Sequence, residues 1–185
     1  MDYHYCPLCG VSLATDHGTG CQRSYCPKCG FVHYKNPTVG VAVIILDQGE
    51  LLLVQRHGSY DGMWCIPCGH VEWDEDIRVC ARRELKEETG LDVDVGPVFD
   101  VHSNFHDRAH QTVGVWFFGK FAGGQLQPGS DARKAEFFAL DDLPENMAFP
   151  TDLLICEKLK NLLLDRERGL GRFCKRYSHY FGGEG

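Results

Sequence analysis

The sequence lacks the features that would assign it to a membrane or to a general role in nucleic-acid binding. No apolar run is long enough to span a bilayer, since the run over residues 39–46 has only the length of a strand. The first residues show no basic and apolar secretory leader. Positive charge is not in excess, because 26 acidic residues outnumber 19 basic ones and leave a formal net charge of −7. We therefore expect a cytoplasmic protein whose 185 residues form one main domain and a small appendage.

Cysteine is abundant, with ten residues, which favours thiols and metal ligation over disulfides when no secretion signal is present. Four of them lie in two Cys-Pro-x-Cys-Gly motifs separated by sixteen residues: Cys6, Cys9, Cys26 and Cys29. Four thiolates at this spacing predict a tetrahedral zinc site, with a redox pair or coincidence as alternatives. Because so short a segment can hardly bury a core and four cysteines leave no open position, we expect a structural zinc. Cys21 is interpreted as a bystander.

Proline and glycine are missing from residues 75–89, which predicts a helix with Asp74 as its N-cap and Gly90 as its left-handed C-cap. At about 100° per residue, one stripe of this helix is apolar: Ile77, Cys80, Ala81 and Leu85. Basic side chains should point away from that stripe: Arg78, Arg82 and Lys86.

Three carboxylates continue the apolar stripe at the end of this helix: Glu84, Glu87 and Glu88. A charge run is usually a solvated surface, but these residues face the same side as the apolar stripe. Like charges at this spacing repel one another, and partial burial is costly unless a cation compensates. Oxygen ligands suit Mg²⁺ or Mn²⁺, which usually keeps positions for phosphate oxygens and water. The pattern therefore favours metal-assisted hydrolysis of a phosphoanhydride.

The whole segment over residues 69–91 resembles the Nudix box, and it fills every constant position of that motif: Gly69, Glu75, Arg83, Glu84, Leu85, Glu87, Glu88, Gly90 and Leu91. The resemblance implies a Nudix α/β/α sandwich with a mixed sheet, here preceded by a small zinc ribbon. It implies that Glu84, Glu87 and Glu88 hold the catalytic Mg²⁺ or Mn²⁺, with Arg83 and Glu75 orienting them. The family often uses a backbone carbonyl at position 68, where Cys68 replaces a usual glycine; Asp74 likewise replaces a frequent glycine.

Around the box we expect a zinc ribbon over residues 1–35, the Nudix domain over 36–170 and a basic tail over 171–185. Apolar runs predict strands over 39–46, 50–56, 93–101, 112–121 and 135–140, the first two forming a hairpin, and a helix over 151–166. The inward residues of that helix are predicted to be Leu154, Leu159, Leu162 and Leu163.

Several residues outside the box are candidates for the site. Arg56 ends a strand and is a candidate phosphate ligand. Nudix enzymes commonly take one more acidic residue from the region that holds Asp131 and Glu136, and spacing does not decide between the two. Trp64 to Cys68 imitates a thioredoxin WCxxC, but the helix that would activate its thiols begins several residues later. Three histidines after the box read as surface residues: His102, His106 and His110.

The ribbon and box together resemble the branch that includes NADH pyrophosphatases, but their Ser-Gln-Pro-Trp-Pro-Phe-Pro run does not occur between residues 92 and 114. Residues 137–144 and 148–152 resemble ribbon-bearing relatives that cleave ADP-ribose and FAD. We therefore expect an enzyme acting on a small nucleotide, a nucleoside diphosphate linked to X. Aromatics such as Tyr60, Trp73 or Phe105 are candidates for stacking on the base, with a core role as the alternative for each. The alternatives are a (d)NTP or capped-RNA hydrolase and a zinc-ribbon regulator that senses a nucleotide. A homodimer is possible.

Overall fold

The structure is a computed structural model that describes residues 3–16, 23–129, 131–167 and 180. The chain divides into two compact units, Met1–Pro37 and Thr38–Gly185. Cys21 and most of the basic tail lie outside the described residues. Within the described residues, no helix has both the length and the apolar character needed to cross a membrane.

The first unit is a three-stranded antiparallel sheet carrying two matched turns. Its strands are β1 (Ala14–Asp16), β2 (Arg23–Tyr25) and β3 (Val32–His33), in that order across the sheet. In each turn, a glycine with a left-handed backbone donates its N–H to the first cysteine carbonyl, from Gly10 to Cys6 at 2.9 Å and from Gly30 to Cys26 at 3.0 Å. The two Cys-Pro-x-Cys-Gly motifs thus form the same local structure.

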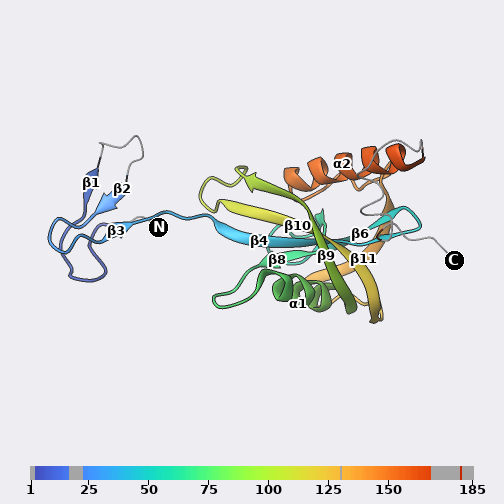
Figure 1. Ribbon diagram of the computed structural model, residues 1–185, viewed down its shortest axis with the longest axis horizontal. Coiled ribbons are helices and arrows are strands. Elements are labelled where there is room, and N and C mark those ends of the chain that lie inside the picture. Colours follow the sequence, from blue (N-terminus) through green and yellow to red (C-terminus); the bar gives the residue numbers. More distant parts are fainter. Residues whose placement is uncertain (1–2, 17–22, 130, 168–179, 181–185) are drawn as a thin grey trace. The chain divides into compact units, whose positions relative to one another are not determined.

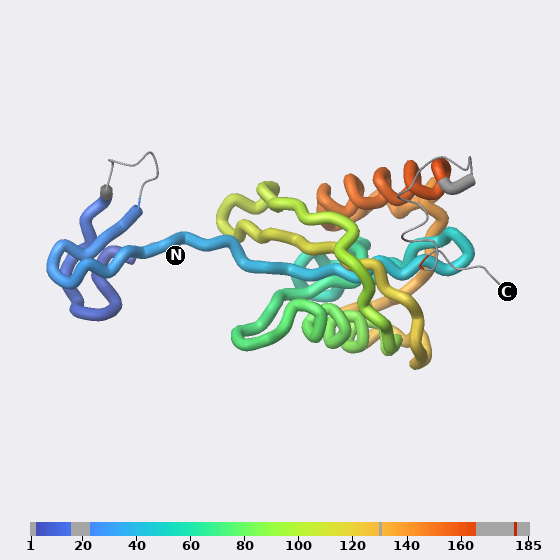
Figure 2. The backbone as a smooth tube through the Cα atoms, viewed as in Figure 1, coloured from blue at the N-terminus to red at the C-terminus, as the bar shows by residue number. Residues whose placement is uncertain are grey.

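The second unit holds two sheets between two helices (Figures 1 and 2). One sheet is mixed and runs β8 (Cys68–His70), β4 (Thr38–Ile44), β10 (Thr112–Gly124) and β9 (Leu91–Asn104), with β10 parallel to β4. The other is antiparallel and runs β11 (Ala132–Ala139), β6 (Glu50–Arg56) and β5 (Leu46–Asp47), while β7 (Trp64–Cys65) also pairs with β6. Helices α1 (Ile77–Thr89) and α2 (Pro150–Glu167) cover opposite sides, which confirms the predicted sandwich.

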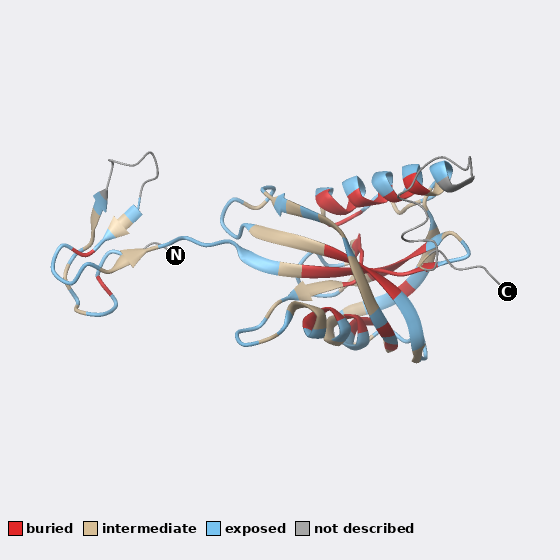
Figure 3. Cartoon of the chain, viewed as in Figure 1, coloured by how far each residue is buried: buried red, intermediate tan, exposed pale blue. Residues whose placement is uncertain are grey.

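Residues that alternate along the central strands belong to two buried clusters, one with residues of α2 and one with residues of α1. Figure 3 shows the buried stretches of these strands and helices. Under α2 lie Ala42, Ile44, Leu51, Leu53, Trp116, Phe118, Ile155 and Leu159. Under α1 lie Val41, Val43, Leu52, Val54, Phe117, Cys80, Ala81 and Leu85. Because helices cover both faces, residues 39–46 read as a continuous apolar run rather than an alternating one.

The predicted hairpin of residues 39–46 with 50–56 is only partly right. The turn is present, with left-handed Gln48 and Gly49, but only β5 pairs with β6, through Leu46 opposite Leu51. Strand β4 ends at Ile44 and lies in the other sheet, between β8 and β10. A run that is apolar on both faces does not specify which neighbour it pairs with.

Helix α2 presents the predicted face in part, and Leu163 is partly buried against the core as expected. Leu159 and Leu162 are buried as expected, but Leu154 is 47% exposed. Ile155 and Cys156 take the inward positions instead. The helix is apolar over much of its circumference, so its pattern alone does not define a narrow face.

Candidate active site and zinc site

The four cysteines of the paired turns come together in the first unit. Their sulfur atoms all lie within 4.8 Å of one another, with Sγ–Sγ distances of 3.6 Å for Cys6–Cys29, 3.5 Å for Cys9–Cys26 and 3.7 Å for Cys9–Cys29. Sulfurs at the corners of a zinc tetrahedron with bonds of about 2.3 Å are separated by about 3.8 Å. The donor set and its geometry therefore fit a tetrahedral zinc ion.

Helix α1 begins two residues later than predicted. Its N-cap is Asp76, whose side chain accepts hydrogen bonds from the Arg78 and Val79 N–H groups at 2.9 and 3.2 Å. Asp74 instead has a left-handed backbone with φ of 63°, which explains why a glycine is frequent there. Gly90 ends the helix with φ of 73°, as predicted.

Arg78 was expected to point away from the apolar stripe of α1, but it packs beside that stripe. Its guanidinium lies 4.9 Å from the centre of the Phe117 ring and donates to the Gly96 carbonyl. The long aliphatic stem of arginine allows a charged residue to pack beside an apolar stripe in this way.

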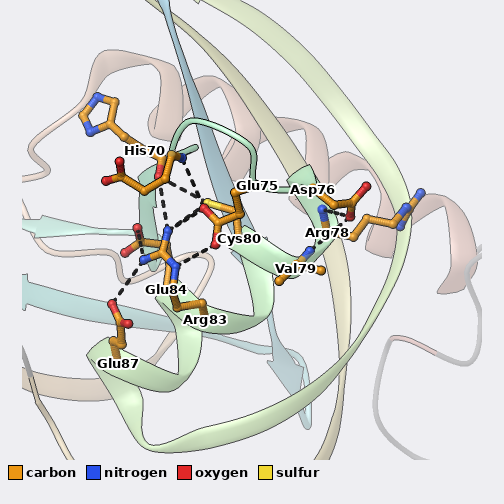
Figure 4. Close-up of polar contacts among 10 residues, drawn as sticks. His70, Glu75, Asp76, Arg78, Val79, Cys80, Arg83, Glu84 and Glu87 are labelled. Atoms are coloured by element: carbon orange, nitrogen blue, oxygen red, sulfur yellow. Dashed lines mark hydrogen bonds and ion pairs between the residues drawn. The ribbon is translucent and has the colours of Figure 1, made fainter.

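Arg83 is the centre of the polar network at the box (Figure 4). Its Nε and Nη2 donate to the two carboxylate oxygens of Glu75 at 2.7 and 2.8 Å, and Nη1 donates to Glu84 at 2.8 Å and Glu87 at 3.3 Å. The bidentate hydrogen bonds from Arg83 lower the pKa of Glu75 to about 2. One guanidinium thus holds Glu84 and Glu87 at defined positions, with Glu75 as its anchor.

Gly69 provides the seat for the Glu84 carboxylate. A Cβ atom at Gly69 would lie 1.9 Å from Glu84 Cδ and 2.2 Å from each carboxylate oxygen. Gly69 does not have a left-handed backbone, so the absence of a side chain, rather than special backbone conformation, is what the site requires. Burial raises the pKa of Glu84, although its hydrogen bond with Arg83 opposes the rise.

Glu88 lies deeper, with only 2% of its surface exposed. Its Oε2 accepts a hydrogen bond from the Cys68 N–H at 2.9 Å. Burial raises the pKa of Glu88 to about 8 against this hydrogen bond, and the negative charge of Asp131 adds to the rise. Glu84 and Glu88 therefore lie at one end of the helix, and hydrogen bonds offset only part of the cost of burying their carboxylates.

Glu84 lines a cleft with a volume of about 600 Å³, together with Arg56, Cys68, Gly69 and Asp131, whereas Glu87 and Glu88 are not among its lining residues. Arg56 Nη2 lies 3.7 Å from Asp131 Oδ2. The charge of Asp131 also acts on both Glu84 and Glu88. Glu136 is placed elsewhere, on β11 opposite Leu53, and pairs with Lys134 at 3.6 Å. Of the two candidate acids, only Asp131 reaches the cleft.

The donor set fits a hard divalent cation. After burial, the negative charges of Glu87 and Asp131 raise the pKa of Glu84, and those of Asp131 and Glu84 raise the pKa of Glu88; a cation would offset this repulsion. Among the described residues, no three carboxylates reach the mutual proximity of the four cysteines. Arg83 holds Glu84 and Glu87, whereas the Cys68 N–H holds Glu88. Cys68 has no left-handed backbone, so a side chain at this position, where the family usually has glycine, causes no backbone strain.

Cys65 and Cys68 lie under the cleft, and both contact Arg56, whose Nη1 is 3.7 Å from Cys65 Sγ and 3.8 Å from Cys68 Sγ. The neighbouring Cys65 thiol, followed by burial, raises the pKa of Cys68 well above its ordinary value. A raised thiol pKa is the opposite of what a reactive cysteine needs. The pair therefore packs around Arg56 and lacks the environment of a thioredoxin-type site.

Two features of the cleft were not predicted from sequence to belong to the site. Asp152 is 2% exposed and accepts from the Ile66 N–H at 3.0 Å and from Trp116 Nε1 at 3.2 Å. Its position in the first turn of α2 was visible in the sequence, but its burial depends on partners 36 and 86 residues away. The second feature is His106, which is not a lone surface histidine, because its Nε2 is 2.9 Å from Tyr60 Oη.

The comparisons with known proteins identify the family of the chain. Residues 35–157 match the family described as the NUDIX domain. An ADP-ribose pyrophosphatase from Methanocaldococcus jannaschii is 34% identical over 129 residues, which cover 69% of this chain and 76% of that protein. An NAD-capped RNA hydrolase NudC from Stutzerimonas stutzeri is 30% identical over 169 residues, which cover 90% of this chain and 58% of that protein. This chain thus spans a little over half the length of that relative.

A solved structure gives the same picture for the fold. The crystal structure of a NUDIX hydrolase from Nitrosomonas europaea is 28% identical, with a TM-score of 0.73 and coverage of 91% of this chain and 94% of that one. The relatives are named as hydrolases and pyrophosphatases, which confirms the enzyme class predicted from the box. With the family match extending over most of the chain and the box helix built as its motif predicts, this protein belongs to the Nudix family of hydrolases.

Proposed function

We propose that this protein hydrolyses the pyrophosphate bond of a nucleoside diphosphate linked to a second group X, with ADP-ribose, FAD or NADH as substrates. The products would be a nucleoside monophosphate and phosphorylated X. The observation that carries the proposal is that Glu84, Arg56 and Asp131 line the same cleft. Carboxylates and a guanidinium facing one space suit a cation-bridged diphosphate.

Each candidate site residue of the box has a defined part in this proposal. Glu84, Glu87 and Glu88, with the Cys68 carbonyl, would hold Mg²⁺ or Mn²⁺, which activates water and neutralises charge on the leaving phosphate. Arg83 and Glu75 keep Glu84 on its seat above Gly69.

Two residues outside the box complete the assignment. Arg56 would bind a phosphate oxygen, since its guanidinium lines the cleft while Phe149 and two thiols hold it in place. Asp131, rather than Glu136, would accept the proton of the attacking water, because only Asp131 lies at the cleft.

The four cysteines of the first unit would hold a structural zinc ion, since four thiolates leave no position for a substrate. None of the eight cysteines that the structure describes is in a disulfide, which supports the further proposal of a reducing, cytoplasmic location.

The test is a panel of substrates at equal concentration with Mg²⁺ or Mn²⁺: ADP-ribose, FAD, NADH, NAD, ADP-glucose, diadenosine polyphosphates and (d)NTPs. We expect the ADP-linked compounds to give the highest kcat/KM and EDTA to abolish the activity. Glu84→Gln and Glu88→Gln should each lower kcat at least roughly 100-fold, since they remove charge and keep shape. Glu136→Gln is the matched control, an exposed glutamate away from the cleft. Highest kcat/KM on (d)NTPs, or activity that persists in EDTA, would refute the proposal.

NAD-capped RNA is a second candidate substrate, because the NudC relative aligns over 90% of this chain. It contains the same diphosphate bond as NADH. A comparison of NADH with NAD-capped RNA of defined length decides between the two: kcat/KM at least tenfold higher on the capped RNA would favour the second candidate.

A further inference from the structure

Three ring side chains form a wall of the cleft, and the proposed chemistry uses only Phe149 among them, as a support for Arg56. Tyr60, His106 and Phe149 all line the cleft. The Tyr60 ring is 5.2 Å from Phe149 and 6.0 Å from His106, and the His106 ring is 5.9 Å from Phe149. The three come from separate parts of the chain, namely the loop after β6, the loop after β9 and the residue before α2. We refer to Tyr60, His106 and Phe149 as the aromatic wall.

Hydrogen bonds hold the aromatic wall in place. His106 Nδ1 contacts Asn104 Oδ1, which can only accept, so Nδ1 carries the proton. In the neutral ring, Nε2 is then the acceptor for the Tyr60 hydroxyl at 2.9 Å. Asp61, the residue after Tyr60, accepts hydrogen bonds from Gly58 N–H at 3.3 Å and from Arg133 Nη2 at 2.9 Å. The wall therefore has fixed ring positions although its outer edge is exposed.

The backbone of Tyr60 indicates that its side chain has a use. Its φ is 60°, a left-handed conformation that is uncommon for a bulky residue and costs about 1 kcal/mol or more. The loop already uses glycine at its two other left-handed positions, Gly58 and Gly62. A tyrosine at a position that favours glycine or asparagine points to a contribution from its ring.

The aromatic wall is also continuous with the candidate phosphate site. The Arg56 guanidinium lies 5.4 Å from the centre of the Phe149 ring, and the same guanidinium is 3.7 Å from Asp131. A ligand whose phosphate meets Arg56 would therefore have the wall beside the group attached to that phosphate. The rings of the wall are inclined to one another by 46–68°, so they form an aromatic corner, and one ring face of this corner next to a phosphate ligand suits stacking of a planar heteroaromatic ring.

We propose that Tyr60 and His106, backed by Phe149, form the subsite for the nucleobase of the substrate and determine its preference for nucleotides over other diphosphates. This inference rests on the proposed function for the identity of the substrate. It also distinguishes among the exposed aromatics of the chain, because Trp73 and Phe105 are 92% and 65% exposed and do not line the cleft.

The test compares two monophosphates that differ only in the base, AMP and ribose 5-phosphate, by calorimetric titration of the full chain with Mg²⁺. Tyr60→Asn removes the ring and keeps a residue that tolerates a left-handed backbone. We expect it to weaken AMP binding roughly 5- to 150-fold, which corresponds to the ~1–3 kcal/mol of a base–aromatic stack. Binding of ribose 5-phosphate should change less than twofold. His106→Ala should weaken AMP binding in the same selective manner, and it does so without a substitution in the loop that holds Tyr60.

Two controls accompany these variants. Tyr60→Phe keeps the ring and should retain AMP affinity within about threefold, the loss reflecting one hydrogen bond. Phe105→Ala removes an exposed aromatic next to His106 that does not line the cleft, and it should leave both affinities unchanged.

The inference is overturned if the wild type binds AMP no more tightly than ribose 5-phosphate, or if Tyr60→Asn and His106→Ala weaken both ligands equally. Failure of the proposed function is a separate result. If the protein hydrolyses none of the ADP-linked compounds but still binds AMP in a Tyr60-dependent way, the subsite stands and the reaction assignment falls. If ADP-ribose is hydrolysed and Tyr60→Asn has the wild-type affinity for AMP, the subsite is wrong.

Discussion

Gly69→Ala is the sharpest test of how the box positions Glu84. The added methyl carbon would lie 1.9 Å from Glu84 Cδ, whereas nonbonded carbon atoms are separated by about 3.5 Å or more. The Glu84 carboxylate must therefore move by roughly 1.5 Å. It can do so, because the obstructed atoms are the far end of a flexible side chain and the backbone at Gly69 is not left-handed. The fold should survive while Glu84 leaves its seat and its 2.8 Å hydrogen bond with Arg83.

A misplacement of about 1 Å in a catalytic group can cost about 100-fold in rate. We therefore expect Gly69→Ala to lower kcat on ADP-ribose at least roughly 100-fold, with a loss of unfolding free energy below about 2 kcal/mol. Hydrolysis assays and urea unfolding measure the two effects. Gly40→Ala is the matched control, since Gly40 lies on the neighbouring strand at the same cleft and its added Cβ would meet only Gly69 O, at an ordinary 3.5 Å. A wild-type kcat in Gly69→Ala would refute the role of the seat.

Three further predictions follow from single groups. Asp131→Asn should lower kcat on ADP-ribose at least roughly tenfold, whereas Glu136→Gln should not change it; equal effects in steady-state assays would contradict the placement of the base. Elemental analysis should find one zinc per chain in the wild type and none after Cys26→Ser with Cys29→Ser, and an unchanged zinc content would count against the cysteine site. Burial raises the pKa of Asp152 from 3.8 to about 7, so its ionisation opposes folding by an amount that is absent below pH 4 and complete above pH 7, at roughly 4 kcal/mol. Asp152→Asn lacks this charge, so urea unfolding should show its stability relative to the wild type increasing from pH 4 to pH 8; a constant difference would disprove this linkage.

The parts of the protein that the sequence predicted well are those whose geometry depends on near neighbours. The end of α1 at Gly90 and the order of glutamates on that helix follow from helical periodicity over 13 residues. The start of α1 was missed by two residues because aspartates at 74 and 76 are both good N-caps, and only the left-handed backbone at Asp74 separates them. The paired cysteine turns are likewise local structures, and their spacing was enough to anticipate that four sulfurs would meet.

By itself, the sequence determined the family, the box helix with its carboxylates, and the two cysteine turns, because side-chain spacing along a helix or a tight turn is set by backbone geometry. The tertiary structure alone placed Asp131 at the cleft and Glu136 away from it, since Asp131 precedes β11 whereas Glu136 lies within that strand opposite Leu53. It also brought Tyr60 to His106 across 46 residues and buried Asp152 against Trp116. These contacts depend on which strands pair and which faces the helices cover, and an apolar pattern leaves both choices open.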